Sequence, residues 1–150
     1  MTSILEGVVK RGTGKKLRDL NVPLAGKTGT TNNNFDAWFI GFSSNLVIGV
    51  YIGFDNPKTL GKNETGSKAA LQIFKNFVEN ALYKEDFNDF NIPKNIYLTS
   101  INYDTGLKSS PGDKKTILEA LKVKDINNIN NNNLISINDH DTLIKFRQFY

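Results

Sequence analysis

A lysine, several threonines and two glycines stand together in the stretch LAGKTGTTNNNFDAW, residues 24–38, and they could bind an anion in two ways. The first is a phosphate loop, in which Gly-Lys-Thr follows another glycine five residues earlier. Gly26-Lys27-Thr28 has Asn21 at that place, and the similar Gly14-Lys15 has Val9. A phosphate loop also opens a helix, whereas Lys27 is followed by a turn and strand-forming residues. The spacing therefore argues against a phosphate site.

The second possibility is a strand that borders a cleft. On a strand, the side chains of Lys27 and Gly29 share one face, while those of Thr28 and Thr30 share the other. Gly29 has no side chain and lets a ligand backbone approach closely. An ammonium group and several hydroxyls beside an open backbone edge suit an extended peptide that ends in a carboxylate. On these residues alone, a Lys-Thr-Gly surface turn is the alternative.

The elements around this stretch indicate a sheet with a helix before it. The first ten residues have an apolar stripe at helical spacing, with Thr2 or Ser3 as the N-cap. Residues 36–42 and 46–54 are rich in β-forming side chains, and Ser43-Ser44-Asn45 separates them, which predicts an antiparallel hairpin. Both runs are almost continuously apolar, and strands of this kind are normally buried on both faces, under helices above and below. The chain does not obviously encode the second helical layer, so we expect it to expose a large apolar patch when it is alone.

A helix from Ser67 is predicted to cover one face of this sheet, because apolar residues recur there at helical spacing: Ala70, Ile73, Phe74, Phe77, Val78, Ala81 and Leu82. Further on, the sequence predicts a weak hairpin around Asp104-Thr105-Gly106 and a short helix capped by Asp113. The Asn-rich segment 127–133 is typical of a flexible connector. We therefore divide the chain into a main portion, 1–84, an extension, 85–126, and a linker and tail, 127–150.

Composition narrows the class of protein. The chain has 19 Lys and Arg against 15 Asp and Glu, but only three of them are arginines and no long basic run occurs, which argues against nucleic acid as a partner. With no cysteine and a single histidine, His140, we expect neither a metal nor a cofactor. No apolar run reaches the ~20 residues of a membrane span, and the first residues carry no export-signal pattern.

Lys-Thr-Gly is also one of three motifs, with S-x-x-K and S-x-N, of the serine enzymes that penicillins acylate. Around it, residues 1–42, 46–61, 64–66 and 69–82 resemble, in order and spacing, the transpeptidase domain of bifunctional class A penicillin-binding proteins of the 1A type. A weaker likeness continues through the segments TSINYDTGL and ILEAL. A match of this length is far more specific than the tripeptide.

The resemblance implies an α+β fold, a β-lactamase/transpeptidase-like antiparallel sheet flanked by helices, of which this chain would hold the C-terminal portion. It implies a D,D-transpeptidase that cross-links peptidoglycan stem peptides ending in D-Ala-D-Ala, binds β-lactams and lies at the periplasmic face of the inner membrane. Lys27 would face the S-x-N serine and attract the substrate carboxylate. Thr30 would place its hydroxyl near that carboxylate and its N–H in the oxyanion hole. Thr28, Gly29 and Thr31 would complete the substrate-binding strand.

The chain departs from the family pattern at the nucleophile. No serine is followed by lysine three positions later, so S-x-x-K is absent. S-x-N occurs at Ser43-Ser44-Asn45 and at Ser136-Ile137-Asn138, but both follow K-T-G, whereas the family places this motif before it. We interpret the first as the hairpin turn and the second as a tail strand. We therefore expect one wall of the site without its nucleophile, inactive unless the N-terminal portion of the same enzyme joins it.

The remaining candidates have structural interpretations. His140 lies between two aspartates in a polar tail and is expected to be solvated. Asp36 is expected to order the preceding Asn turn. Trp38, Phe39 and Tyr51 have strand periodicity and are expected in the core, with an aromatic at a cleft mouth as the alternative. For the whole chain, the alternatives are a non-enzymatic peptide or cell-wall binding module, a remnant of a decayed gene, half of a split gene, or a piece cut deliberately from a longer protein.

Overall fold

The structure, a computed structural model, describes residues 1–83 and 87–122 of the chain. The chain forms two compact units, Met1–Asn91 and Ile92–Tyr150. The first unit holds the Lys-Thr-Gly stretch, and the described residues of the second form a small strand pair.

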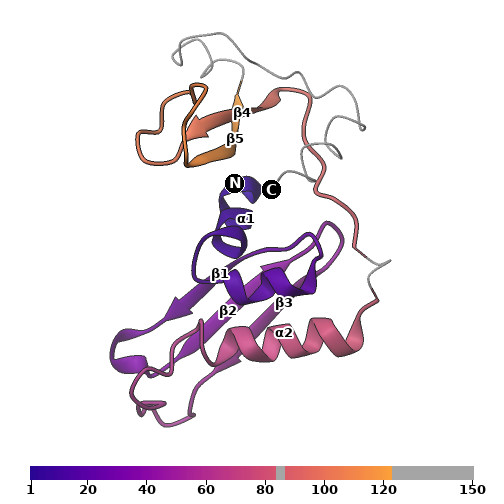
Figure 1. The fold of residues 1–150 in the computed structure, drawn as a ribbon. Helices are drawn as coiled ribbons and strands as arrows, with labels where there is room; N and C mark the ends of the chain where they lie inside the picture. Colours follow the sequence, from indigo (N-terminus) through magenta and orange to yellow (C-terminus); the bar gives the residue numbers. More distant parts are fainter. Residues whose placement is uncertain (84–86, 123–150) are drawn as a thin grey trace. The chain divides into compact units, whose positions relative to one another are not determined.

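A three-stranded antiparallel sheet is the centre of the first unit (Figure 1). Its strands are β1 (Ala25–Thr30), β2 (Ala37–Phe42) and β3 (Val47–Ile52), in the order β1-β2-β3. The predicted hairpin is confirmed, since β2 and β3 pair from Ala37 opposite Ile52 to Phe42 opposite Val47. The Asn turn between β1 and β2 is the short 3-10 helix η2 (Asn32–Asn34), with positive φ angles of 59° and 54° at Asn33 and Asn34.

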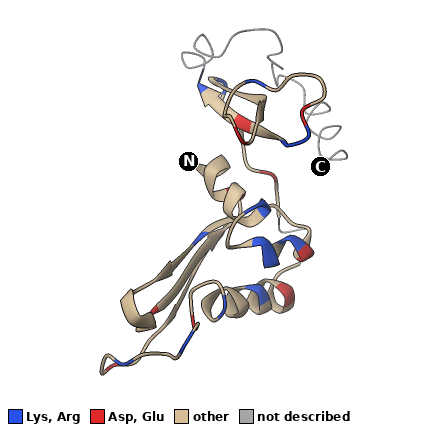
Figure 2. Cartoon of the chain, turned by 60° about the vertical axis from the view of Figure 1, so that its left-hand side comes forward, with Lys and Arg blue, Asp and Glu red and all other residues tan. Residues whose placement is uncertain are grey.

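Helices cover one face of this sheet. The α-helix α1 (Thr2–Lys10) packs against β1, and the 3-10 helix η1 (Lys15–Leu20) lies beside the second α-helix, α2 (Ala70–Ala81), on the same side of the strands (Figure 1, Figure 2). The core between them contains an edge-to-face pair of Phe39 and Phe74, with ring centroids 4.9 Å apart. The buried apolar residues of this core are Val9, Leu17, Leu20, Leu24, Ala37, Phe39, Ala70, Leu71, Phe74 and Val78.

The helix boundaries differ from the predicted ones. The N-cap of α1 is Met1 rather than Thr2 or Ser3, and no side chain caps the helix. The helix α2 begins at Ala70 instead of Ser67, because residues 66–69 form turns in which Ala69 N–H donates to Thr65 O at 2.9 Å. The buried stripe of α2 is also narrower than predicted, since Ile73 and Phe77 are about half exposed, whereas Leu71 is fully buried.

The opposite face of the sheet is exposed in the described residues, as expected for a chain that encodes a helical layer for one face only. Burial alternates along β2 and β3, as expected for strands with a single covered face. The exposed fractions of Trp38, Ile40, Val47 and Tyr51 are 42%, 48%, 69% and 51%. Because the residues on this exposed face are apolar instead of polar, the sequences of the strands resemble those of strands buried on both faces.

The second unit contains the strands β4 (Ile96–Asn102) and β5 (Thr116–Lys122), which pair antiparallel over their whole length. The predicted helix after Asp113 is therefore wrong. Backbone pairing with β4 outweighs the helical propensity of TILEALK, a common override for a short segment. The Asp113 carboxylate accepts the Ser110 N–H at 2.9 Å, which closes a turn instead of capping a helix.

The turn predicted around Asp104-Thr105-Gly106 is confirmed, because Gly106 N–H donates to Asn102 O at 2.9 Å. After this turn the chain pairs with β4 at one isolated bridge, between Ile101 and Lys108. The main partner of β4 is β5, further along the chain. The proposed boundaries at 84/85 and 126/127 stay predictions, since they fall at or within 84–86 and 123–150, outside the described residues. In the part of the chain that is described, no helix has the length and apolar character for crossing a membrane.

The mixture of helices with antiparallel sheet confirms the α+β class.

The core of the first unit depends on one aromatic contact between α2 and β2. Replacing Phe74, fully buried, by Ala should lower the free energy of unfolding by about 3 to 5 kcal/mol. Urea unfolding followed by circular dichroism measures this. Phe77→Ala on the same helix is the control and should change stability little, because its side chain is 46% exposed. Equal losses would contradict the assignment of the buried face.

Among the described residues, the outer edge of β3 is unpaired and one face of the sheet is exposed. Both features should make the isolated chain self-associate, because β3 carries neither charge nor proline to block pairing. Val47→Lys should reduce this association, measured by analytical ultracentrifugation over a range of concentrations. Gln72→Lys, which adds the same charge to an exposed position of α2, should not. A wild-type chain that stays monomeric at high concentration would contradict the expectation.

Candidate functional site

The strand β1 pairs with β2 on one side and, among the described residues, has a free edge on the other. Antiparallel ladders alternate between residue pairs that exchange hydrogen bonds and pairs that do not. Just beyond the ladder, Thr31 N–H donates to Asp36 O at 3.1 Å, so Thr31 and Asp36 form a hydrogen-bonded pair. By alternation along the register, Gly29 and Lys27 also bond to β2, whereas the N–H and C=O groups of Thr28 and Thr30 point to the free edge. This edge can therefore accept an extended peptide.

The two faces of β1 are divided as the sequence predicts. Lys27 lies opposite Ile40 and Gly29 opposite Trp38 on the exposed face, while Thr28 lies opposite the buried Phe39. The Lys27 side chain is exposed, and its ammonium group donates to Thr28 O at 2.8 Å. Since Thr28 O points to the free edge, the Lys27 charge lies at that edge.

The hydroxyls of the strand have partners from two distant segments. Thr28 Oγ1 lies 3.0 Å from Thr13 Oγ1, in the loop between α1 and η1. Thr30 Oγ1 accepts the Gly66 N–H at 3.0 Å. A Cβ at Gly66 would collide with Gly29 O and Trp38 O, so only glycine fits this close approach of backbone to backbone. Thr13 and Gly66 were not identified as site residues from the sequence, because both contacts span long sequence separations that no local pattern encodes.

Thr31 belongs to the turn at the end of the strand. Its hydroxyl donates to the Asp36 carboxylate at 3.2 Å and accepts the Asp36 N–H at 2.8 Å. The expectation that Asp36 orders the Asn turn is thus confirmed. The other oxygen of the same carboxylate accepts the Tyr51 hydroxyl at 3.0 Å. Asp36 therefore ties together the turn, β2 and β3.

Trp38 and Tyr51 are not core residues, contrary to the expectation. Their side chains alternate with the buried Phe39 and lie on the exposed sheet face, with ring centroids 4.6 Å apart. Phe39 is fully buried, as expected. The tilted aromatic pair lies next to Gly29, since Trp38 is its direct partner across the ladder. The alternative of an aromatic at a cleft mouth remains consistent with this position.

Ser43-Ser44-Asn45 forms the hairpin turn, as interpreted. Ser43 is buried, its hydroxyl donates to the Asn45 side-chain oxygen at 2.8 Å, and it accepts the Leu46 N–H at 3.2 Å. It follows Phe42, which pairs with Ala25 at the far end of β1 from Thr30. These hydrogen bonds give Ser43 a structural role in the turn. Ser136, Asn138 and His140 lie outside the described residues.

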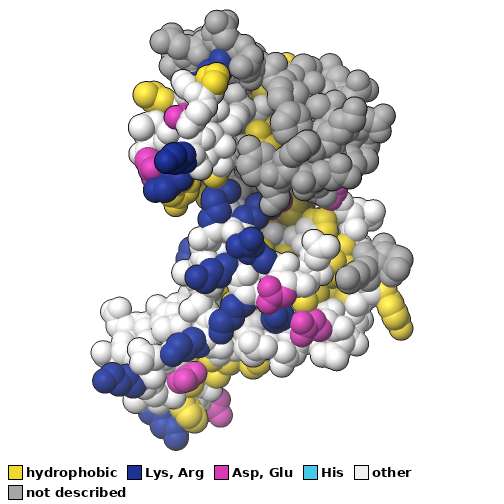
Figure 3. Space-filling view, viewed as in Figure 1, with side chains coloured by type: hydrophobic (Ala, Val, Ile, Leu, Met, Phe, Trp, Pro, Cys, Tyr) yellow, Lys and Arg dark blue, Asp and Glu magenta, His cyan; other side chains and the backbone are white. Residues whose placement is uncertain are grey.

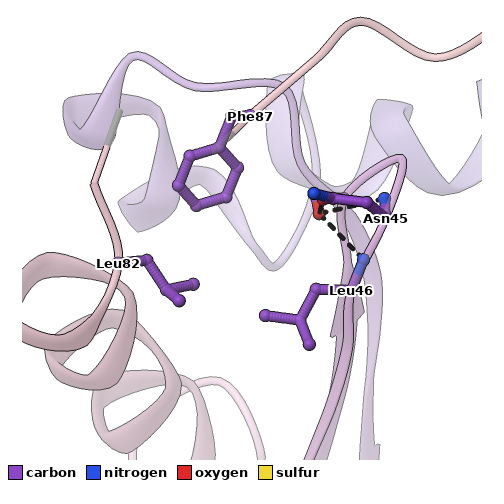
Figure 4. A pocket seen from close by; sticks show the side chains of 5 residues that line it. Asn45, Leu46, Leu82 and Phe87 are labelled. Atoms are coloured by element: carbon purple, nitrogen blue, oxygen red, sulfur yellow. Dashed lines mark hydrogen bonds between the residues drawn. The ribbon is translucent and has the colours of Figure 1, made fainter. Parts of the chain in front are cut away.

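A pocket of about 210 Å³ lies at this same end of the hairpin, lined by Ser43, Asn45, Leu46, Leu82 and Phe87. Figure 4 shows that Leu46, Leu82 and Phe87 surround an apolar space. Nearby, Phe42 and Phe90 form an edge-to-face pair with ring centroids 5.6 Å apart. The pocket lies between the hairpin turn and the segment after α2, and its lining does not include Lys27.

The surface around the α1–η1 loop is positively charged. Lys10, Arg11, Lys15, Lys16 and Arg18 are all exposed, and basic side chains outnumber acidic ones over these elements (Figure 2, Figure 3). Glu6 pairs with Lys10 at 3.0 Å, and Asp19 pairs with Lys75 of α2 at 3.2 Å. The excess of positive charge favours an anionic ligand in this region. The described residues contain no cluster of His, Cys, Asp and Glu that could hold a metal ion.

The contact between Asp36 and Tyr51 changes the pKa of the tyrosine. The hydrogen bond to Asp36 is the main factor that raises the pKa of the Tyr51 phenol above 10.0, with smaller effects of desolvation and of the negative charges of Asp36 and Asp55. A raised folded-state pKa contributes stability below pH ~10, and this contribution is lost as pH rises through the folded-state pKa. Asp36→Asn should lower the pKa of Tyr51 toward its ordinary value, measured by NMR of the ring. Asp55→Asn should cause a smaller decrease. Equal effects would contradict the geometry.

The chain matches a known protein family. The model of the penicillin binding protein transpeptidase domain matches residues 1–79. Penicillin-binding protein 1A of Rickettsia conorii is 38% identical over 146 residues, 97% of this chain but 18% of that protein. The Pseudomonas aeruginosa penicillin-binding protein 1A is 40% identical over 126 residues, 83% of this chain and 15% of that protein.

The fold agrees with this relationship. The crystal structure of penicillin-binding protein 1A from Haemophilus influenzae superposes with a TM-score of 0.62 at 28% identity, over 81% of this chain and 19% of that one. The chain therefore spans about a fifth of the length of the relatives that it matches. It belongs to the penicillin-binding protein transpeptidase family and is of the 1A type within the class A proteins.

Proposed function

We propose that this chain is the C-terminal part of a peptidoglycan D,D-transpeptidase and supplies the strand that binds the substrate. The observation that carries the proposal is the free edge of β1, where the backbone groups of Thr28 and Thr30 face outward beside the Lys27 ammonium group. A stem peptide ending in D-Ala-D-Ala would lie along this edge as an additional strand. A β-lactam would occupy the same edge.

In the complete domain, a serine outside this chain would attack the penultimate D-Ala carbonyl. The terminal D-Ala would leave with a proton, and an amine of a neighbouring stem peptide would then resolve the acyl-enzyme. Thr30 N–H, on the free edge, would donate to the carbonyl oxygen as its negative charge develops. Lys27 would attract the substrate carboxylate, and Thr28, Gly29 and Thr31 would complete the binding strand.

The same proposal makes the chain inactive by itself. S-x-x-K is absent from the sequence, and Ser43 is buried in the hairpin turn. The partner that completes the site would be the N-terminal portion of the transpeptidase domain. This portion would pack on the exposed sheet face, which includes Trp38, Val47 and Tyr51. The packing would remove that apolar face from water. The complete enzyme would act at the periplasmic face of the inner membrane.

A second candidate is a non-enzymatic module that binds peptide or cell-wall material without turnover. The observation in its favour is that the free edge of β1 belongs to this chain, whereas the S-x-x-K motif of the nucleophile does not. Saturable binding of a D-Ala-D-Ala peptide by the chain, without any activity when a nucleophile-bearing portion is added, would favour this module over the transpeptidase part.

The test of the proposed function is covalent labelling by a fluorescent penicillin. The purified chain alone should not be labelled. When it is mixed with an N-terminal portion of a related transpeptidase domain that carries S-x-x-K and S-x-N, the label should appear on that added portion, separated by size on a gel. Label on this chain would contradict its inactivity, and no labelling of the mixture would count against the transpeptidase role.

Lys27→Ala should reduce the labelling rate of this mixture by about tenfold to a hundredfold, the effect expected from losing an interaction with a charged group. Lys62→Ala, which removes an exposed lysine in a surface loop, is the matched control and should leave the rate unchanged. A rate that is the same for both variants would show that the β1 edge does not take part.

A further inference from the structure

Thr13 contacts the Lys-Thr-Gly strand from a loop that the sequence places 15 residues before it. Its Oγ1 lies 3.0 Å from Thr28 Oγ1, and either hydroxyl can be the donor. The loop Arg11-Gly12-Thr13-Gly14 joins α1 to η1, and buried Val9 and Leu17 anchor it on both sides. Thr13 itself is exposed, so this contact adds little to the core.

The loop is held in one conformation by its two glycines. Gly12 N–H donates to Gly7 O and Val8 O, both at 3.1 Å, and Gly14 N–H donates to Val8 O at 3.0 Å. A Cβ at Gly12 would lie 3.0 Å from Val8 Cα and from Val8 O, and one at Gly14 would lie 3.2 Å from Val8 O. Both glycines therefore pack directly on the end of α1, which fixes where the Thr13 hydroxyl lies.

The hydroxyl pair leaves one proton for a ligand. Each threonine hydroxyl has one proton, and the Thr13–Thr28 hydrogen bond uses one of the two. When Thr13 donates to Thr28, the Thr28 proton remains available at the β1 edge. At Thr30 the situation is similar, because a backbone N–H can only donate and the Gly66 N–H therefore leaves the Thr30 proton available. Because Thr28 and Thr30 share one face of β1, both protons are available to a ligand on the same side of the strand.

We propose that Thr13 is a positioning residue that orients the Thr28 hydroxyl toward the C-terminal carboxylate of a bound peptide. The inference rests on the proposed function of the β1 edge and names a further group that serves it. A carboxylate accepts several hydrogen bonds at once, whereas a neutral C-terminal amide also presents N–H groups that would meet the oriented protons. Thr13 therefore adds to the preference for an acid over an amide that the Lys27 charge also favours.

The test compares two ligands that differ only at the C-terminus, N-acetyl-D-Ala-D-Ala and its amide. Trp38, the single tryptophan of the chain and the neighbour of Gly29, reports binding to the intact chain by fluorescence. The wild type should bind the acid more tightly. Thr13→Val should reduce the ratio of acid to amide affinity by about tenfold, the usual effect of one hydrogen bond to a charged group, while affinity for the amide is retained.

Three further variants separate orientation from a structural role. Thr13→Ser should keep the wild-type ratio, and Thr59→Val, which removes another exposed threonine hydroxyl, should also keep it. Thr13→Val combined with Thr28→Val should give the ratio of Thr28→Val alone, because Thr13 acts through Thr28. A loss of fold would weaken both ligands equally, and Thr13→Ala replaces Thr13→Val if circular dichroism shows that the latter is unfolded.

The outcomes distinguish the inference from the proposed function. If the wild type does not prefer the acid, the role of the β1 edge in carboxylate binding fails and the inference fails with it. If the wild type prefers the acid and Thr13→Val preserves the ratio, the edge binds carboxylates without Thr13, and the inference alone is overturned. Additive effects of Thr13→Val and Thr28→Val would also overturn it.

Discussion

One-sided pairing of β1 is the constraint on which the rest of the site depends. Because β2 takes the backbone groups of Lys27 and Gly29, those of Thr28 and Thr30 are left at the free edge. An unpaired edge would normally be loose, yet here two distant segments and the turn after the strand hold it. The α1–η1 loop contacts Thr28, the segment before α2 contacts Thr30, and Asp36 fixes the turn after the strand. The edge is therefore both open and ordered, which is what binding of an extended peptide needs.

The single covered face of the sheet explains how the chain relates to its longer relatives. Phe39, Phe74 and Leu71 give the chain a core of its own on one side. On the other side, Trp38 and Tyr51 contact each other but remain about half exposed. An apolar sheet face of this kind is favourable only when another layer covers it. Since the chain spans about a fifth of the related proteins, the covering layer and the missing nucleophile would both come from the remainder of such a domain.

The sequence predicts local structure well and long-range contacts poorly. The β2–β3 hairpin, the two faces of β1 and the role of Asp36 all follow from short patterns that act over a few residues. The segment TILEALK has the pattern of a helix, and its pairing with β4 depends on a strand that is distant in the sequence. The sequence does not predict the contacts of Thr13 and Gly66 with β1 for the same reason. Nothing near either residue indicates which strand it will contact. The exposed side of α2 was misassigned because Ile73 and Phe77 are apolar although they lie outside the buried stripe.

The proposed function requires that a peptide bind along the free edge of β1. Amide hydrogen exchange followed by NMR, with and without a D-Ala-D-Ala peptide, measures this residue by residue. The N–H groups of Thr28 and Thr30 should become protected when the peptide is added, while those of Lys27 and Gly29, already bonded to β2, should change little. Protection confined to β3 or to the exposed sheet face, or none on β1 at saturating peptide, would contradict it.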